Sequence, residues 1–103
     1  VLTSPANSSG STMLIGALQN TGRARSVGQA TGGNVEGPTA GILFFLPLPN
    51  SKIRTRVPAQ RSITGYKALS ASGGVEPALA VSPSFDDRRS GRDPVLDAAL
   101  RPK

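Results

Sequence analysis

Residues 6–18 read "ANSSGSTMLIGAL", in which a cluster of small polar residues leads directly into an apolar run. A Thr-Gly helix stop follows at residues 21–22. The stretch therefore predicts a helix that begins at Ser9 or Ser11 and ends at Asn20. Its apolar residues fall at helical spacing, which is typical of a helix packed on a sheet. The expected buried face consists of Met13, Leu14, Ile15, Ala17 and Leu18.

The segments on either side predict short strands and one more helix. Residues 1–3 predict a short buried strand, and residues 24–28 predict another. Two longer strands, at 40–48 and 52–57, are expected to form an antiparallel hairpin. The other expected segments are loops at 29–38 and 60–74, a strand at 75–81, an exposed polar segment at 82–91 and a terminal helix at 94–100. This order of strands and helices predicts an α/β fold.

Some of these segments also predict burial. The bulky run at residues 42–46, ILFFL, is continuous rather than alternating, which predicts a strand buried on both faces. Its partner strand alternates and is expected to be half-exposed. The basic residues on its solvated side are Lys52, Arg54 and Arg56. In the terminal helix, Asp93 is the expected N-cap and Pro94 suits the first helical position. The residues expected to face inward from this helix are Val95, Leu96, Ala99 and Leu100.

The composition is lean for an independent hydrophobic core. The 103 residues are 37% hydrophobic, with one Tyr, three Phe and no Trp, and the 12 Gly and nine Pro imply many turns. We therefore expect one small domain, over residues 1–103, that needs more chain or a partner to close its core. The first residue is Val rather than Met, which favours a processed chain or a piece of a longer one.

The charge and the absent residue types exclude several classes of function. The formal net charge is +6, but the basic residues are scattered among few aromatics, so nucleic acid is not an expected partner. With no Cys, no His and no carboxylates at metal-ligand spacing, we expect no metal. The glycine-rich loop at residues 28–33 lacks the Lys-Ser/Thr ending of a phosphate-binding loop, so no nucleotide cofactor is expected. No apolar run reaches the roughly 18 residues of a membrane span.

The serine cluster allows two interpretations. The first N–H groups of a helix lack internal acceptors and favour negative charge, so they can stabilise an oxyanion beside a nucleophilic serine. The alternative is that Ser8, Ser9 or Ser11 caps the helix, because serine caps are far commoner than catalytic serines. A nucleophile also needs a base, and no Lys, Asp or Glu is close to Ser9 in the sequence. From the residues alone, the cap is the favoured interpretation.

An ordered set of phrases nevertheless resembles a known family. The run at residues 8–33, "SSGSTMLIGALQNTGRARSVGQATGG", is similar to the active-site region of the C-terminal processing, or tail-specific, serine proteases. Downstream, "LPLP", "GGVEP" and "GRDPVLDAAL" resemble the closing hairpin, a turn and the last helix of that family. The similarity therefore spans nearly the whole chain.

The resemblance implies roles for individual residues. The family nucleophile falls on Ser9, and the N–H of Gly10 would be a donor of the oxyanion hole. In one branch of the family the base is a lysine, and that position falls on Asn34, whose amide nitrogen has no basic lone pair. Further departures from the family pattern lie at Thr12, Asn20 and Ala78. These departures resemble the tricorn-like branch, in which a histidine upstream of the serine is the base.

The resemblance also implies a fold, a function and a location. The fold would be the C-terminal portion of a ClpP/crotonase-like domain, with the upstream half and any PDZ-like domain outside this chain. The function would be peptide-bond hydrolysis through an acyl-enzyme on Ser9, with the base supplied from upstream of this chain. Without that base, the isolated 103 residues are expected to have little or no activity. The expected partners are a polypeptide substrate, the remainder of the peptidase domain and further copies in a homo-oligomer. The expected location is the bacterial periplasm or another site outside the cytoplasm.

Two other functions stay open at this point. A non-catalytic homologue could keep the fold and bind a peptide or another ligand, and the departures at Asn20, Asn34 and Ala78 favour it. The retained Ser9 and Gly10 and the intact "GQATGG" loop argue against it. The third possibility is a small basic adaptor without chemistry, in which the serines are helix caps.

Overall fold

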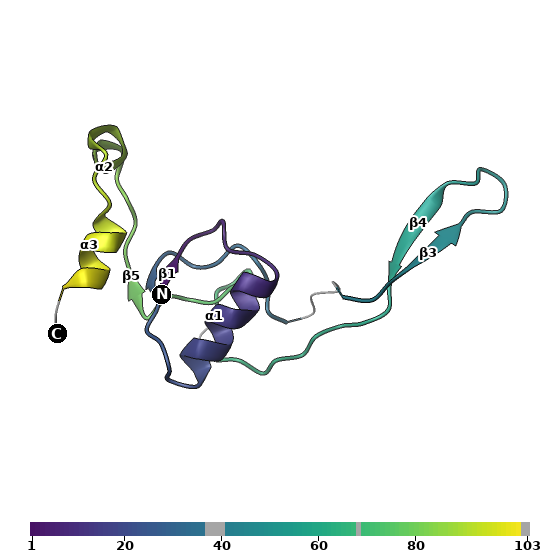
Figure 1. The fold of residues 1–103 in the computed structure, drawn as a ribbon, viewed down its shortest axis with the longest axis horizontal. Helices are drawn as coiled ribbons and strands as arrows, with labels where there is room; N and C mark the ends of the chain where they lie inside the picture. Colours follow the sequence, from purple (N-terminus) through teal and green to yellow (C-terminus); the bar gives the residue numbers. More distant parts are fainter. Residues whose placement is uncertain (37–40, 68, 102–103) are drawn as a thin grey trace.

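The helices and strands follow the predicted order, with one addition. The computed structural model describes residues 1–36, 41–67 and 69–101. Their elements are β1 (Leu2–Thr3), α1 (Gly10–Asn20), β2 (Val27–Gly28), β3 (Leu43–Pro47), β4 (Arg54–Pro58), β5 (Leu79–Ala80), α2 (Phe85–Ser90) and α3 (Pro94–Leu100) (Figure 1). The mixture of helices and strands agrees with the predicted α/β class, and α1 and α3 lie where the sequence predicts them.

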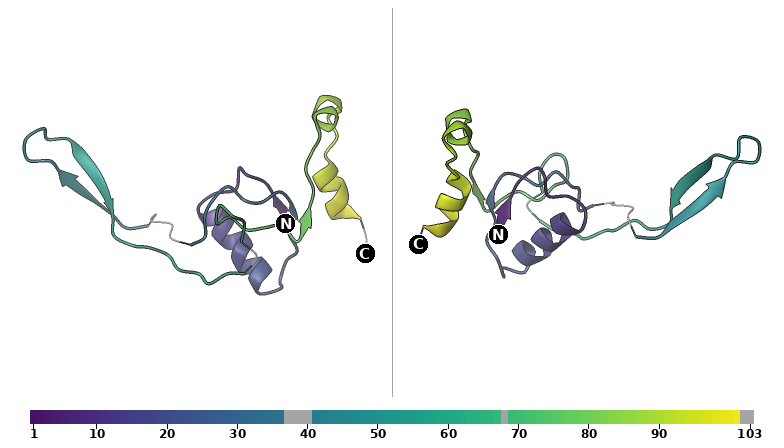
Figure 2. Two further views of the ribbon diagram at one scale, coloured as in Figure 1. Left: turned by 180° about the vertical axis from the view of Figure 1, so that it is seen from behind. Right: turned by 45° about the horizontal axis from the view of Figure 1, so that its top comes forward.

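The three shortest strands form a parallel sheet in the order β1-β2-β5. Val27 of β2 pairs with Leu2 on one side and with Leu79 on the other. Helix α3 lies against β1 and β2, and in both views of Figure 2 it is next to the N-terminus of the chain. Gly28 has a φ of 134°, and a Cβ there would collide with the carbonyl oxygen of Thr3. This close approach of two strands requires glycine at position 28.

The described core lies on one side of α1. Ile15 is buried together with Val35 and Val75, and Tyr66 and Leu69 pack against this cluster. These partners come from segments outside the named strands. The helix therefore packs on loop segments, and the expectation that it packs on a sheet is wrong.

The buried face of α1 also differs from the predicted stripe. The helix buries Thr12, Ile15 and Gly16, whereas Leu14 is 60% exposed. A Cβ at Gly16 would lie only 2.5 Å from the Tyr66 ring, so the ring packs directly on the helix backbone. Small residues thus let the loops approach α1 closely, which rotates the buried face away from the apolar pattern.

Strands β3 and β4 form an antiparallel hairpin that projects away from the rest of the chain (Figure 1). Every residue from 41 to 61 is exposed, and Phe44 is 63% exposed. The expectation of a strand buried on both faces is therefore wrong for the described residues; Ala40, its predicted first residue, lies outside them. The apolar run forms a strand as predicted, but no described segment packs on either of its faces.

The hairpin has two chemically different faces. Opposed residues of an antiparallel pair share a face, so the register sorts the side chains into two sets. The first, which we call the apolar face, consists of Ile42, Phe44, Leu46, Leu48, Ile53, Thr55 and Val57. The second, the basic face, consists of Leu43, Phe45, Pro47, Arg54, Arg56 and Pro58. Here the Arg54 guanidinium lies 4.8 Å from the centre of the Phe45 ring, in a cation–π contact. The predicted basic side thus exists, although Lys52 lies in the turn beyond the strand.

Helix α2 is an addition to the predicted elements, because the sequence predicts only an exposed polar segment at residues 82–91. The Ser84 hydroxyl accepts a hydrogen bond from the Asp87 N–H at 3.1 Å, and the Asp87 carboxylate accepts one from the Ser84 N–H at 2.9 Å. This reciprocal capping box starts the helix, and Gly91 ends it in the left-handed conformation. The bonds from Ser84 also hold the pKa of Asp87 below its usual range.

Helix α3 begins as predicted but packs less than predicted. The Asp93 carboxylate accepts hydrogen bonds from the N–H groups of Val95 and Leu96, both at 3.0 Å, which confirms Asp93 as the N-cap. However, Leu96, Ala99 and Leu100 are exposed, so the expectation that these residues face inward is wrong. Val95 is half-buried where the helix meets β1 and β2.

The overall dimensions fit the lean composition. The radius of gyration is 17.7 Å, whereas a compact domain of 100 residues has about 13 Å. In the described part of the chain, the buried hydrophobic residues are Ile15, Val27, Val35 and Val75. Among the described helices, none combines the length and the apolar character needed to cross a bilayer.

Candidate active site

Ser9 lies at the N-cap position of α1 and has an unusual backbone conformation, with φ 51° and ψ −127°. A positive φ is uncommon for a residue with a Cβ, and such conformations cost on the order of 1–3 kcal/mol. The residue is exposed, and its side chain accepts no capping hydrogen bond from the helix. For Ser9, therefore, the interpretation as an ordinary side-chain cap is wrong.

The neighbouring serines bond to each other instead. The Ser8 N–H donates to the Ser11 hydroxyl at 3.1 Å, and that hydroxyl donates to the Ser8 carbonyl oxygen at 2.8 Å. The Ser11 N–H also donates to the Ser8 carbonyl oxygen, at 3.2 Å. These bonds stabilise the start of α1 without the side chain of Ser9, whose hydroxyl is left for other chemistry.

Gly10 provides a free donor beside this hydroxyl. Within residues 1–36, 41–67 and 69–101, its N–H has no hydrogen-bond acceptor. A Cβ built on Gly10 would meet no atom within 4 Å, so the space around it is open. The N-terminus of a helix also favours negative charge. An oxygen that becomes negative next to Ser9 could therefore be stabilised here.

The turn before Ser9 is held by the glycine-rich loop. The Asn7 carbonyl oxygen accepts hydrogen bonds from the Thr12 hydroxyl at 3.1 Å, the Gly32 N–H at 3.0 Å and the Gly33 N–H at 3.1 Å. The sequence of this loop resembles a phosphate-binding loop, but these two N–H groups donate to the protein's own backbone. The loop therefore supports the segment that carries the serine.

Asn34, at which the resemblance places the lysine of the family, follows this loop. Its Oδ1 accepts a hydrogen bond from the Glu36 N–H at 2.7 Å, so the side chain closes a turn. The Glu36 carboxylate accepts hydrogen bonds from the Thr64 hydroxyl at 2.6 Å, the Gly65 N–H at 2.7 Å and the Thr64 N–H at 3.0 Å. These bonds, the one from the Thr64 hydroxyl above all, hold the pKa of Glu36 below its usual range. Glu36 is thus a poor base, and Asn34 has a structural contact.

The described site lacks a proton acceptor for the Ser9 hydroxyl. The sequence has no His, and no Lys, Asp or Glu side chain of the described residues is hydrogen-bonded to Ser9. A group of three His, Cys, Asp or Glu that could hold a metal ion is likewise absent from the described part of the chain. The described residues therefore bring together an uncapped serine hydroxyl and an unbonded helix N–H, without a side chain that takes up the serine proton.

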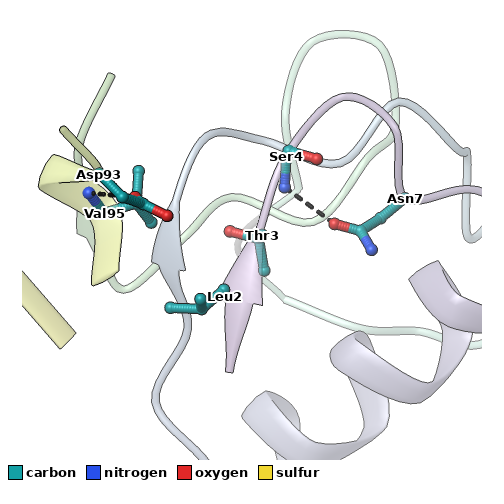
Figure 3. A pocket seen from close by; sticks show the side chains of 6 residues that line it. All are labelled: Leu2, Thr3, Ser4, Asn7, Asp93 and Val95. Carbon is teal, nitrogen blue, oxygen red and sulfur yellow. Dashed lines mark hydrogen bonds between the residues drawn. The ribbon is translucent and has the colours of Figure 1, made fainter. Parts of the chain in front are cut away.

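An open cavity of about 280 Å³ lies between β1 and the start of α3 (Figure 3). It is lined by Leu2, Thr3, Ser4, Asn7, Asp93 and Val95. Two of its polar side chains already have backbone partners: Asn7 Oδ1 accepts from the Ser4 N–H at 2.8 Å, and the Asp93 carboxylate caps α3. No residue from 8 to 12 lines this cavity, so it is separate from the Ser9 hydroxyl.

A buried serine ties α1 to the segments that lead into β2 and β5. Ser26 is 1% exposed, and its hydroxyl donates to Gln19 Oε1 and accepts from the Ala78 N–H at 2.9 Å. The Gln19 side chain also donates to the Glu76 carbonyl oxygen at 2.9 Å. The only sequence signal was a polar residue next to the apolar Val27. These bonds fix the C-terminal end of the helix whose N-terminal end carries the candidate nucleophile.

Comparison with known protein families matches residues 1–81 to peptidase family S41. Comparison with curated proteins and with solved structures found no match. The matched residues form most of the chain and include Ser9, α1 and the whole hairpin. The resemblance to the C-terminal processing peptidases is thereby confirmed at the level of the family, which consists of serine peptidases. The chain belongs to peptidase family S41.

Proposed function

We propose that this chain carries the nucleophile of a serine endopeptidase of the tail-specific type, and that Ser9 is that nucleophile. The observation that carries the proposal is the Ser9 backbone, which has a positive φ and a hydroxyl that makes no capping bond to the helix. Its hydroxyl would attack a peptide carbonyl, the Gly10 N–H would stabilise the oxyanion, and water would then release the acyl-enzyme. The open space beside Gly10 supports this role, because a substrate backbone must approach closely there.

The general base is proposed to come from polypeptide outside these 103 residues, as the histidine does in the tricorn-like branch. The lack of His in the chain and the structural contact of Asn34 support this proposal. The isolated chain would then keep a nucleophile that is poorly activated. Loss of one member of a catalytic triad leaves only about 10³–10⁴-fold catalysis over water.

The remainder of the peptidase domain is proposed to cover the apolar face of the hairpin and to complete a ClpP/crotonase-like fold. Monomeric soluble proteins rarely leave large contiguous apolar patches open, and such patches commonly mark an interaction. Phe44, Leu46 and Ile53 on this face are each more than half exposed. The basic face would stay in solvent. A periplasmic or other extracytoplasmic location and assembly into homo-oligomers are proposed from the family alone.

The second candidate is a non-catalytic homologue that binds a peptide or another ligand. The missing proton acceptor beside Ser9 in the described residues favours it. The two candidates differ in one respect that can be measured, because only the peptidase needs the Ser9 hydroxyl for turnover.

The experiment is to measure cleavage of unstructured polypeptides by the full-length protein that contains these residues, as wild type, Ser9→Ala and Ser8→Ala. The peptidase proposal predicts cleavage by the wild type, loss of cleavage in Ser9→Ala and retained cleavage in Ser8→Ala, the matched control. Binding without cleavage by the folded wild type would instead support the binding module.

A further inference from the structure

The positive φ of Ser9 depends on contacts with neighbouring residues that fix the backbone there. Unusual backbone conformations persist only where the surrounding structure fixes them. Here the fixing contacts come from both sides of the serine. One comes from α1, in the next turn of the chain, and the other comes from the loop at residues 31–33.

Thr12 supplies the contact from the helix. The residue is completely buried, and its hydroxyl donates to the Asn7 carbonyl oxygen at 3.1 Å. This bond bridges the residues on either side of Ser9 and closes the turn in which Ser9 lies. In the sequence, Thr12 is only a departure from the family pattern. Its contact with Asn7 gives the residue a physical role.

Gly33 supplies the contact from the loop. A Cβ at this position would lie 2.8 Å from the Ser8 Cα, 3.0 Å from the Ser9 nitrogen and 2.7 Å from the Thr12 hydroxyl oxygen. The backbone of the loop is therefore pressed against the turn, and the Gly33 N–H donates to the same Asn7 carbonyl oxygen. The Ser9 turn is thus enclosed between Thr12 and the loop.

We propose that Thr12 is a positioning residue for Ser9: its hydroxyl, by holding the Asn7 carbonyl against the loop, keeps the backbone conformation that presents the Ser9 hydroxyl to a substrate. This inference rests on the proposed role of Ser9 as the nucleophile. Because two N–H groups also donate to the Asn7 carbonyl, it stays hydrogen-bonded when the Thr12 hydroxyl is removed. The hydroxyl therefore matters more for the placement of Ser9 than for global stability.

The test compares Thr12→Val with Thr12→Ser in the full-length protein. Valine keeps the buried volume and loses the hydroxyl, whereas serine keeps the hydroxyl and loses the methyl group. The readouts are the rate constant for modification of Ser9 by a fluorophosphonate at saturation, the concentration for half-saturation, and the urea midpoint of unfolding. The saturating rate constant separates the placement of Ser9 from the binding of the probe.

For Thr12→Val we expect the saturating rate constant to fall about 10- to 100-fold, because misplacement by about 1 Å has effects of this size. The half-saturation concentration and the urea midpoint should change little. For Thr12→Ser we expect the reverse, a lower urea midpoint with a rate constant close to that of the wild type. Modification of Thr12→Val at the wild-type rate would overturn the proposal. If Thr12→Val does not fold, Thr12→Ala is compared with Thr12→Ser; equal rate constants in these two variants would overturn it as well.

A wild-type protein that is folded but not modified at Ser9 would refute the proposed function and not this inference. Crystal structures of the wild type and Thr12→Val then decide the inference. A change of the Ser9 φ to negative values in the variant supports the positioning role, and an unchanged positive φ overturns it.

Discussion

Replacement of Ser26 by alanine should loosen the contact between α1 and the segments that lead into β2 and β5. The hydroxyl of this buried residue accepts from the Ala78 N–H and donates to Gln19 Oε1, so its removal leaves that N–H and that oxygen without a partner. A buried polar group left without its partner costs about 1–3 kcal/mol. The Leu79 N–H, which donates to the Ser26 carbonyl oxygen at 3.0 Å, keeps its own bond and reports how easily β5 opens from β2.

The assay is amide hydrogen exchange of Leu79 in the full-length protein. A loss of about 1–3 kcal/mol from the opening free energy makes exchange about 5- to 150-fold faster. The matched control is Ser72→Ala, which removes an exposed hydroxyl that lies 3.0 Å from the Ser70 hydroxyl. Exposed substitutions of this kind usually change stability by less than about 0.5 kcal/mol. Equal exchange of Leu79 in Ser26→Ala and Ser72→Ala would refute the assignment of Ser26 as the residue that ties α1 to the segments before β2 and β5.

Three further predictions follow from the site. Ser9→Gly and Ser9→Ala should both abolish peptidase activity. The free energy of unfolding of Ser9→Gly should exceed that of Ser9→Ala by about 1 kcal/mol, because glycine accepts a positive φ without strain. Equal urea midpoints of the two variants would argue against strain at Ser9. The Glu36 contact with Gly65 should be complete above the usual pKa of a carboxyl and be lost as the pH falls through its lowered pKa. Protection of the Gly65 amide relative to its intrinsic exchange rate at each pH would show this, and protection that persists in acid would contradict it. Asn34→Ala should leave turnover nearly unchanged, because an amide cannot act as a base, and a loss equal to that of Ser9→Ala would show that the base assignment is wrong.

Local signals predicted the elements well. The serine cluster before α1 and the Asp93-Pro94 pair before α3 specify helix starts through bonds to nearby N–H groups, and both helices begin there. The same kind of signal was present for α2, in Ser84 and Asp87, but the helix has only six residues and no apolar periodicity. A helix start is thus predictable from the sequence where an apolar helical pattern follows the cap. Where the cap stands alone, as in α2, the helix is easily missed.

Burial could not be predicted in the same way, because it depends on partners far away in the chain. The apolar run of β3 predicted a buried strand, yet no described segment covers the hairpin. In α1, the buried positions are Thr12, Ile15 and Gly16 because the Tyr66 ring and the loop at 31–33 approach there. Neither contact has a signal within the helix itself.

In the candidate site, too, the local features are predictable from the sequence and the contacts between distant residues are not. The resemblance placed the nucleophile at Ser9 and the oxyanion donor at Gly10, and both assignments stay predictions. The backbone conformation of Ser9 and the role of Gly33 depend on a contact between residues 24 positions apart, which a single sequence does not reveal. The sequence contains no His, and the expectation that Asn34 cannot replace a lysine base stays a prediction as well.

The most direct measurement is to map, by mass spectrometry of proteolytic fragments, the residue of the folded full-length protein that a fluorophosphonate modifies. One adduct is expected, on Ser9; it should form in Ser11→Ala, but neither in Ser9→Ala nor in protein that is unfolded before labelling. An adduct on a different serine, or no adduct on a folded and ligand-free protein, would contradict the assignment of Ser9 as a nucleophile.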